Sequence, residues 1–201
     1  MAAGYQFEVC PPSEAAECGV CSGETPAQFV ARLACQKAAD VGRRIGRTLL
    51  PSPDQPSVGA RRGAGGEGDY PDCLVLGCDT VAECGGRILG KPADEAHARR
   101  MLQTLSGREH HVLSGLCLWP LPDGEPAVRV AMTTLRMDRL TPEQLDAYLA
   151  DGQWEGKAGA FGYQDGLDWV HVIEGSESNV VGLPLKLLAE MLRCYGIGDA
   201  P

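Results

Sequence analysis

Apolar residues recur at helical spacing in four stretches of the chain. The clearest stretch predicts an amphipathic helix over Pro26–Gly46, with Thr25 as the N-cap and proline at the first helical position. The same signals predict three further helices: Asp94–Leu105, a segment that opens at Thr141-Pro142 and ends near Asp151-Gly152, and Pro184–Tyr195.

Shorter apolar runs between these helices predict strands. Cys73–Cys78 is a compact apolar run of the kind that forms a buried strand. The other predicted strands are Tyr5–Pro11, two arms within Val81–Leu89 joined at Gly85-Gly86, His111–Leu121, Ala127–Met137 and Trp169–Ile173. Because helices and strands alternate and several connections suit antiparallel pairing, the pattern favours an α/β fold with a mixed sheet.

One stretch interrupts this pattern. Pro51–Tyr70 is rich in Gly, Pro, Ser and Arg and has almost no apolar periodicity, so we expect a flexible surface insertion there. The chain has 201 residues, which suits one ordinary α/β domain. We therefore expect a single domain over residues 1–201 with the insertion inside it.

Charge narrows the choice of partners. The net charge is −9 and the sequence pI is about 4.9, so bulk electrostatics do not favour nucleic acid or an anionic membrane. No stretch approaches the roughly 20 apolar residues that span a bilayer, and we find no signal peptide, so we expect a cytoplasmic protein. Binding of phosphate groups would need a local cluster of lysines or a divalent metal.

Nine cysteines are scattered along the chain, and several lie in apolar runs, so we expect reduced structural thiols. Cys18-Gly-Val-Cys21 raises the alternative of a zinc or redox module. Zinc normally needs a second Cys/His pair, and the sequence has none at ligand spacing nearby.

Two segments carry candidate chemistry. Gly77-Cys78-Asp79-Thr80 directly follows the predicted buried strand, and Gly90-Lys91-Pro92 comes soon after it. A carboxylate at this place can bind a divalent cation or activate water, and a lysine can neutralise phosphate oxygens. Alone, the same residues are explained somewhat better by a turn cap at Asp79 and a surface charge at Lys91.

The second segment is Gly156–Gln164, where glycines allow backbone amides to approach a ligand closely. It lacks the spacing of a P-loop, and by itself a plain glycine-rich turn explains it as well. A nucleophilic enzyme has little support, because there is no Gly-x-Ser-x-Gly elbow and the four histidines are dispersed.

Taken in order, these motifs resemble the Maf family. The resemblance rests on five segments: Gly77-Cys-Asp-Thr-Val81, Ile88-Leu-Gly-Lys-Pro92, Leu105-Ser-Gly-Arg108, Lys157-Ala-Gly-Ala-Phe-Gly-Tyr-Gln164, and Ile173-Glu-Gly-Ser176 followed by Asn179-Val-Val-Gly-Leu-Pro-Leu185. Several motifs in the same order are far more specific than any one of them.

The resemblance implies an elongated mixed α/β sheet flanked by helices, similar to inosine-triphosphate pyrophosphatases. It implies hydrolysis of a nucleoside triphosphate between the α and β phosphates, with Mg²⁺ or Mn²⁺ as the cofactor, and often a homodimer. The alternative function is a non-catalytic, nucleotide-binding regulator of cell division and septum formation.

The family's site residues carry over to this chain one by one. Asp79 matches the catalytic aspartate, Lys91 the lysine of the Gly-Lys-Pro segment, and Lys37 a lysine that faces the phosphates. A family glutamate falls on Glu14 or Glu17, of which we favour Glu17. The resemblance implies that Asp79 and Glu17 hold the metal.

Two residues of the glycine segment, Lys157 and Gln164, are expected at the substrate. Gln164 matches the glutamine of the family branch that prefers thymidine and uridine triphosphates.

The chain lacks the family's usual Ser-x-Ser-Pro-Arg-Arg segment. We therefore expect an N-terminal truncation relative to the family, an unpaired interior sheet edge that is prone to aggregation, and weak activity or none.

Overall fold

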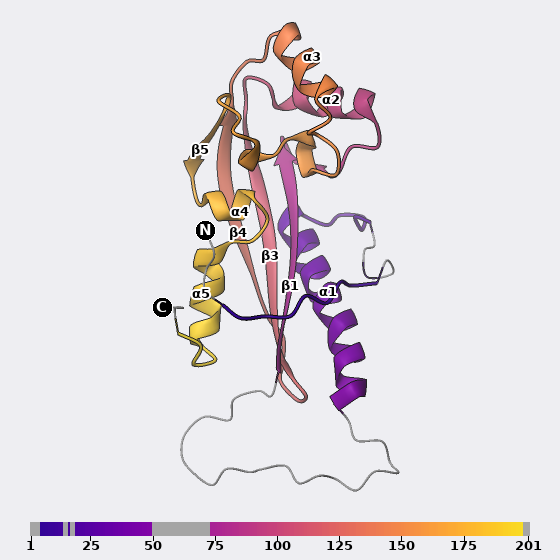
Figure 1. Cartoon of the computed structure of the whole chain (residues 1–201), viewed down its shortest axis with the longest axis vertical. Helices are drawn as coiled ribbons and strands as arrows, with labels where there is room; N and C mark the ends of the chain where they lie inside the picture. The colour runs from indigo at the N-terminus through magenta and orange to yellow at the C-terminus, as the bar shows by residue number, and fades with distance from the viewer. Residues whose placement is uncertain (1–4, 14–15, 17–18, 50–72, 199–201) are drawn as a thin grey trace, which may run out of the picture.

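The computed structural model describes residues 5–13, 16, 19–49 and 73–198. Residues 51–70, where we expect the insertion, lie outside this range, as do Glu14 and Glu17. The molecule is elongated, with the strands along its long axis and with α2 and α3 at one end, which we call the upper lobe (Figure 1).

Within the described ranges, a sheet of five strands forms the centre. The strands are β1 (Cys73–Cys84), β2 (Arg87–Leu89), β3 (Glu109–Leu121), β4 (Ala127–Met137) and β5 (Val170–Glu174), in the order β2-β1-β3-β4-β5. The α/β fold with flanking helices is confirmed. All four described pairings are antiparallel, so no parallel component of the expected mixed sheet lies among the described strands.

The helices are α1 (Pro26–Leu49), α2 (Glu95–Leu105), α3 (Pro142–Ala150), α4 (Glu177–Val180) and α5 (Leu185–Arg193). Two short 3₁₀ turns precede β5, η2 (Ala158–Ala160) and η3 (Tyr163–Asp165). The predicted starts are confirmed. Thr25 and Gln28 bond each other's backbone N–H groups at α1, and Thr141 forms a complete capping box with Gln144 at α3.

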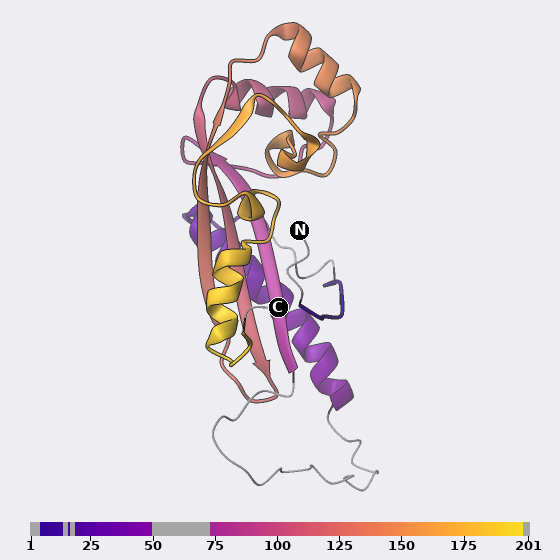
Figure 2. The ribbon, with the colours of Figure 1, turned by 60° about the vertical axis from the view of Figure 1, so that its left-hand side comes forward.

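α1 lies directly on one face of the sheet because two glycines leave room for it. A Cβ atom at Gly77 would lie 2.2 Å from the carbonyl oxygen of Ala34, and one at Gly115 would lie 2.2 Å from that of Val30. Ala34, Ala38 and Val41 then pack against the sheet. The opposite face is covered by α5, as Figure 2 shows.

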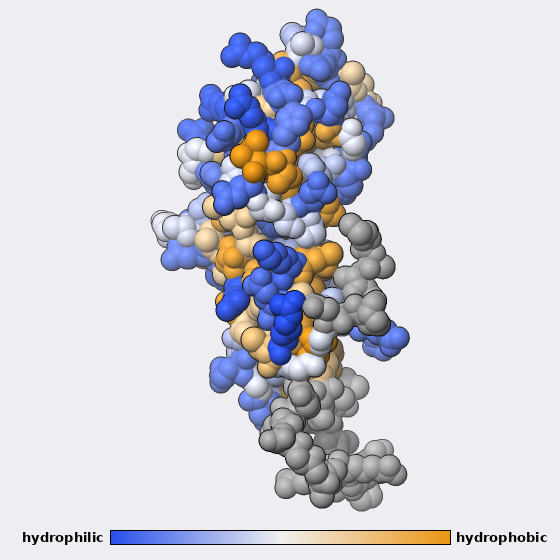
Figure 3. Space-filling model, turned by 90° about the vertical axis from the view of Figure 1, so that its left-hand side faces the viewer, coloured by the Kyte–Doolittle hydropathy of each residue, from blue (hydrophilic) through white to orange (hydrophobic). Residues whose placement is uncertain are grey.

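The buried side chains of the described residues form four clusters, and β3 contributes to each of them. The upper lobe encloses the largest cluster, which contains Val112, and α5 covers the cluster that contains Leu116. The two clusters beneath α1 contain Leu113 and Cys117. Seen from the side of α5 and β5, the surface is mostly hydrophilic over the upper lobe, with scattered apolar patches (Figure 3).

The predicted strand over residues 5–11 is wrong. This segment has no regular structure, and Phe7 and Val9 are 80% and 82% exposed. Tyr5 packs against the cluster beneath α5, and Ser13 bonds Asp40 of α1, so the segment passes from one face of the sheet to the other (Figure 1). Alternating apolar residues form a strand only where a neighbouring strand supplies hydrogen bonds, and this path crosses the sheet instead.

β1 has an open edge. β3 pairs with it over residues 73–83, but β2 pairs with it only over residues 82–84. Among the residues that the structure describes, no strand pairs with that side of β1 from residue 73 to residue 81. The truncation relative to the family stays a prediction. No helix within the described ranges is long and apolar enough to cross a membrane.

Candidate active site

The structure brings Lys37 and Asp79 together although 42 positions separate them. The Lys37 ammonium donates to Asp79 Oδ1 at 2.7 Å, and the two side chains are only 18% and 13% exposed. Lys37 lies on α1, and Asp79 lies on β1 directly opposite Gly115 of β3. The two glycines let α1 rest on the sheet, and the side chain of Lys37 therefore reaches the Asp79 carboxylate from within the helix.

Asp79 does not follow β1, as the sequence suggested, but lies in its middle. The strand continues to Cys84 because β3 is long enough to pair with it through residue 83. Asp79 therefore has a fixed backbone and points to the face that α1 covers, with Gly77 and Val81 on the same side.

Thr80 points to the opposite face and joins a buried polar network. Its hydroxyl lies 2.7 Å from that of Ser114 and donates to the carbonyl of Gly182 at 3.3 Å. The Asn179 amide donates to Val112 O at 3.0 Å and to Thr133 Oγ1 at 2.9 Å. This network fixes residues 175–182 behind Asp79. Ser114 and Thr133 were missed by sequence reasoning, since nothing near them in the sequence indicates which distant polar groups they meet.

Lys91 is exposed and follows β2. β2 runs antiparallel to β1 with Leu89 opposite Ala82, so the chain that leaves β2 heads along the open edge toward the part of β1 that holds Asp79. The carbonyl of Gly90 accepts a hydrogen bond from Gly159 N at 3.0 Å. The residue before Lys91 is thus bonded to the glycine segment. No contact that the structure describes joins Lys91 to Lys37 or Asp79.

The two predicted substrate residues of the glycine segment, Lys157 and Gln164, differ in exposure and in pairing. The Lys157 ammonium is paired with the Asp165 carboxylate and is 24% exposed. Gln164, one residue before Asp165, is exposed. Tyr163 donates its hydroxyl hydrogen to Glu177 Oε1 at 2.9 Å.

Glu17 lies outside the described residues, but the loop that follows it is held to α1. The Arg32 guanidinium contacts both carboxylate oxygens of Glu24 at 2.7 Å and donates to Gly19 O at 3.0 Å. The bonds from Arg32 lower the pKa of Glu24 to about 2. No signal in the sequence singled out Arg32, because its partner is set by how the loop folds back.

The described residues contain no group of three or more His, Cys, Asp or Glu side chains that could hold a metal ion. Asp79 is a carboxylate of the hard, oxygen-donating kind that Mg²⁺ and Mn²⁺ take. Mg²⁺ is commonly held by one or two carboxylates, with water and substrate phosphates completing its shell. The donor chemistry of Asp79 therefore fits a metal that arrives with its substrate.

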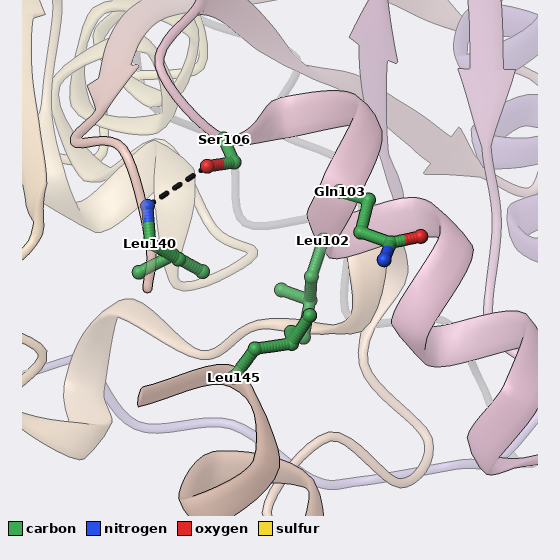
Figure 4. Close-up of a pocket in the computed structure, with 5 residues that line it drawn as sticks. All are labelled: Leu102, Gln103, Ser106, Leu140 and Leu145. Carbon is green, nitrogen blue, oxygen red and sulfur yellow. Dashed lines mark hydrogen bonds between the residues drawn. The ribbon is translucent and has the colours of Figure 1, made fainter. Parts of the chain in front are cut away.

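A shallow pocket of about 130 Å³ lies in the upper lobe (Figure 4). It is lined by Leu102, Gln103, Ser106, Leu140 and Leu145, between α2 and the start of α3. Its serine hydroxyl already accepts a hydrogen bond from Leu140 N at 2.8 Å. The pocket contains none of the predicted site residues, and we assign it no chemistry.

Known proteins similar to this chain include several pyrophosphatases. A dTTP/UTP pyrophosphatase of Rhodopirellula baltica is 50% identical over 195 residues, which cover 96% of this chain and 75% of that protein. Proteins with the same name from Paramagnetospirillum magneticum and Geotalea uraniireducens are 42% and 37% identical, over 76% and 96% of this chain and 79% and 87% of their own lengths. The family described as Maf-like protein matches residues 1–195, and the chain belongs to the Maf family.

Proposed function

We propose that this protein hydrolyses a nucleoside triphosphate between its α and β phosphates, releasing a nucleoside monophosphate and pyrophosphate, with dTTP and UTP as substrates. The observation that carries the proposal is the Lys37–Asp79 pair, a cation and a carboxylate held 2.7 Å apart in a partly buried place. The names of the relatives, all dTTP/UTP pyrophosphatases, support the substrate class.

Hydrolysis forms one bond from a water oxygen to phosphorus and breaks one bridging P–O bond. It needs a positioned water and neutralised phosphate charge more than a covalent nucleophile. The Asp79 carboxylate can accept a hydrogen bond from that water, while Lys37 turns its ammonium from Asp79 to a phosphate oxygen. Lys91 stands at the open edge of β1, where its charge can meet the same triphosphate.

A divalent cation would be held by Asp79, by Glu17 as a second carboxylate, and by phosphate oxygens, and it would supply charge neutralisation. The surrounding residues orient the phosphates and the water. Gln164 would contact the nucleobase, since its amide side chain is exposed at the end of the glycine segment.

The test is a pyrophosphate-release panel over standard and methylated nucleoside triphosphates with Mg²⁺ or Mn²⁺. Asp79→Asn keeps the shape of the side chain but removes its charge, and we expect turnover to fall at least ~100-fold. Asp123→Asn, on the exposed β3–β4 turn, is the matched control and keeps full activity. Full activity in Asp79→Asn, or saturable triphosphate binding without any turnover by the unaltered chain, contradicts the proposal.

A homodimer and a cytoplasmic location, both expected from the sequence, stay predictions. Light scattering of the purified chain tests the first, and fractionation of cells that produce it tests the second.

A further inference from the structure

An ion pair closes the glycine loop, by which we mean residues 157–165. Lys157 precedes η2 at one end of the loop, and Asp165 ends η3 at the other. Their side chains are 24% and 12% exposed, so the pair is largely shielded from water. A shielded charge pair resists separation more than a surface pair does, because either partner alone would be left poorly solvated.

The backbone between the two partners fits beneath this pair. A Cβ atom at Gly162 would lie 2.7 Å from Lys157 Nζ and 2.9 Å from its Cδ atom. The φ angle of Gly162 is −121°, a value that any residue adopts. The ion pair therefore lies across this position, and a larger residue here would have to displace the Lys157 and Asp165 side chains.

The rest of the loop is fastened on both sides. Gly159 donates to Gly90 O at 3.0 Å, next to Lys91. Phe161 is buried and meets the ring of His110 edge-on, with 5.4 Å between ring centroids. Between Gly159 and Phe161, Ala160 is fully buried and has a φ angle of 64°, a backbone conformation that residues other than glycine rarely adopt. Such a conformation persists only where the surrounding contacts enforce it.

Gln164 lies between two anchored residues. Asp165 is bound by Lys157, and Tyr163 is bound by Glu177. The glutamine itself is exposed, and the backbone that carries it is held on both sides by these two contacts. An amide carries one acceptor oxygen and two donor hydrogens, and it selects a ligand by these only if it is held within about 0.5 Å of the right place.

We infer that Lys157 and Asp165 are positioning residues, which fix the backbone that carries Gln164 and thereby set the preference for the nucleobase. This inference rests on the proposed function. Uracil and thymine offer an N3–H donor and an O4 acceptor, whereas cytosine has an acceptor at N3 and an amino group at C4. A Gln164 amide held in one orientation distinguishes these two hydrogen-bonding patterns. An amide that rotates freely exchanges its oxygen and nitrogen and binds both bases.

The competing role for Lys157 is direct contact with the phosphates. That role predicts equal losses for every nucleotide, since all share the triphosphate. It also predicts that removing the charge of Asp165 leaves binding intact, because the lysine is then released toward the substrate.

The experiment compares kcat and KM for UTP and CTP, which have the same sugar and phosphates. We expect Lys157→Met and Asp165→Asn each to lower the preference for UTP over CTP about tenfold, mainly through KM for UTP. Lys186→Met, on an exposed position of α5, is the control for loss of one positive charge and keeps the preference. The charge-exchanged variant K157D/D165K restores part of the preference, and Lys157→Arg retains most of it.

Gln164→Ala provides the reference state. In that background Lys157→Met produces no further loss of preference if the ion pair acts through Gln164. An equal loss for UTP and CTP in Lys157→Met, or an unaffected Asp165→Asn, overturns the inference. Absence of pyrophosphate release by the unaltered chain would instead refute the proposed function, so the two failures are distinguishable.

Discussion

The close approach of α1 to the sheet can be tested by a single methyl group. In Gly115→Ala the added Cβ atom would lie 2.2 Å from Val30 O and 2.8 Å from Ala31 N, both backbone atoms of α1. Carbon–oxygen contacts are normally no shorter than about 3.3 Å, so the helix must withdraw by roughly 1 Å. Asp79 lies directly opposite Gly115, and the withdrawal therefore separates Lys37 from it.

The magnitude follows from the packing. Overfilling a packed interface typically costs about 1–3 kcal/mol, and here the obstacle is backbone that cannot turn aside. Gly42→Ala is the matched control on the same helix. Its Cβ atom would lie 3.6 and 3.9 Å from the two methyl carbons of Leu121, an ordinary contact, and alanine within a helix is favoured over glycine by about 0.5–1 kcal/mol.

The assay is urea unfolding followed by circular dichroism, together with pyrophosphate release. We expect Gly115→Ala to lower the free energy of unfolding by about 2 kcal/mol or more and to reduce turnover more than tenfold. Gly42→Ala should raise the free energy of unfolding and keep turnover. If Gly115→Ala changes neither stability nor turnover, α1 does not rest on the backbone of β3 in the way the structure describes.

Three further predictions concern stability and thiol chemistry. Burial lowers the pKa of His110 from 6.5 to about 4, so the unfolded chain binds more protons between these values. Stability should therefore fall by ~3 kcal/mol as the pH drops through this window, and urea titrations of His110→Leu should lack that part of the fall. Thr141→Ala removes the capping box of α3 and should cost about 1 kcal/mol in thermal unfolding. Exposed Cys10 and Cys194 should react promptly with a thiol reagent, whereas Cys117, whose pKa burial raises to about 12, should react only on unfolding; rapid labelling of Cys117 would contradict its burial.

The elements that were predicted correctly depend on local signals. Thr25 and Thr141 mark helix starts through bonds to residues three positions away, and Gly85-Gly86 turns the chain between β1 and β2 at φ angles of 60° and 81°. Such bonds and angles are set within a few residues, so the sequence alone reveals them.

The features that were missed depend on distant partners. The alternation in residues 5–11 could not show that the segment crosses the sheet instead of joining it. The extent of β1 beyond Cys78 depends on β3. That strand begins at Glu109, 25 positions after β1 ends at Cys84. The resemblance placed Lys157 at the substrate, but only the folded loop shows that Asp165 binds its ammonium.

The place of β3 in all four apolar clusters has a consequence for how the molecule unfolds. Neither the upper lobe nor the half beneath α1 and α5 can lose its packing without exposing part of the same strand. The two halves are therefore coupled into one cooperative unit, and unfolding should follow a single two-state transition. The amide hydrogens of β3 should exchange with solvent only when the whole chain opens, at a rate that reports global stability.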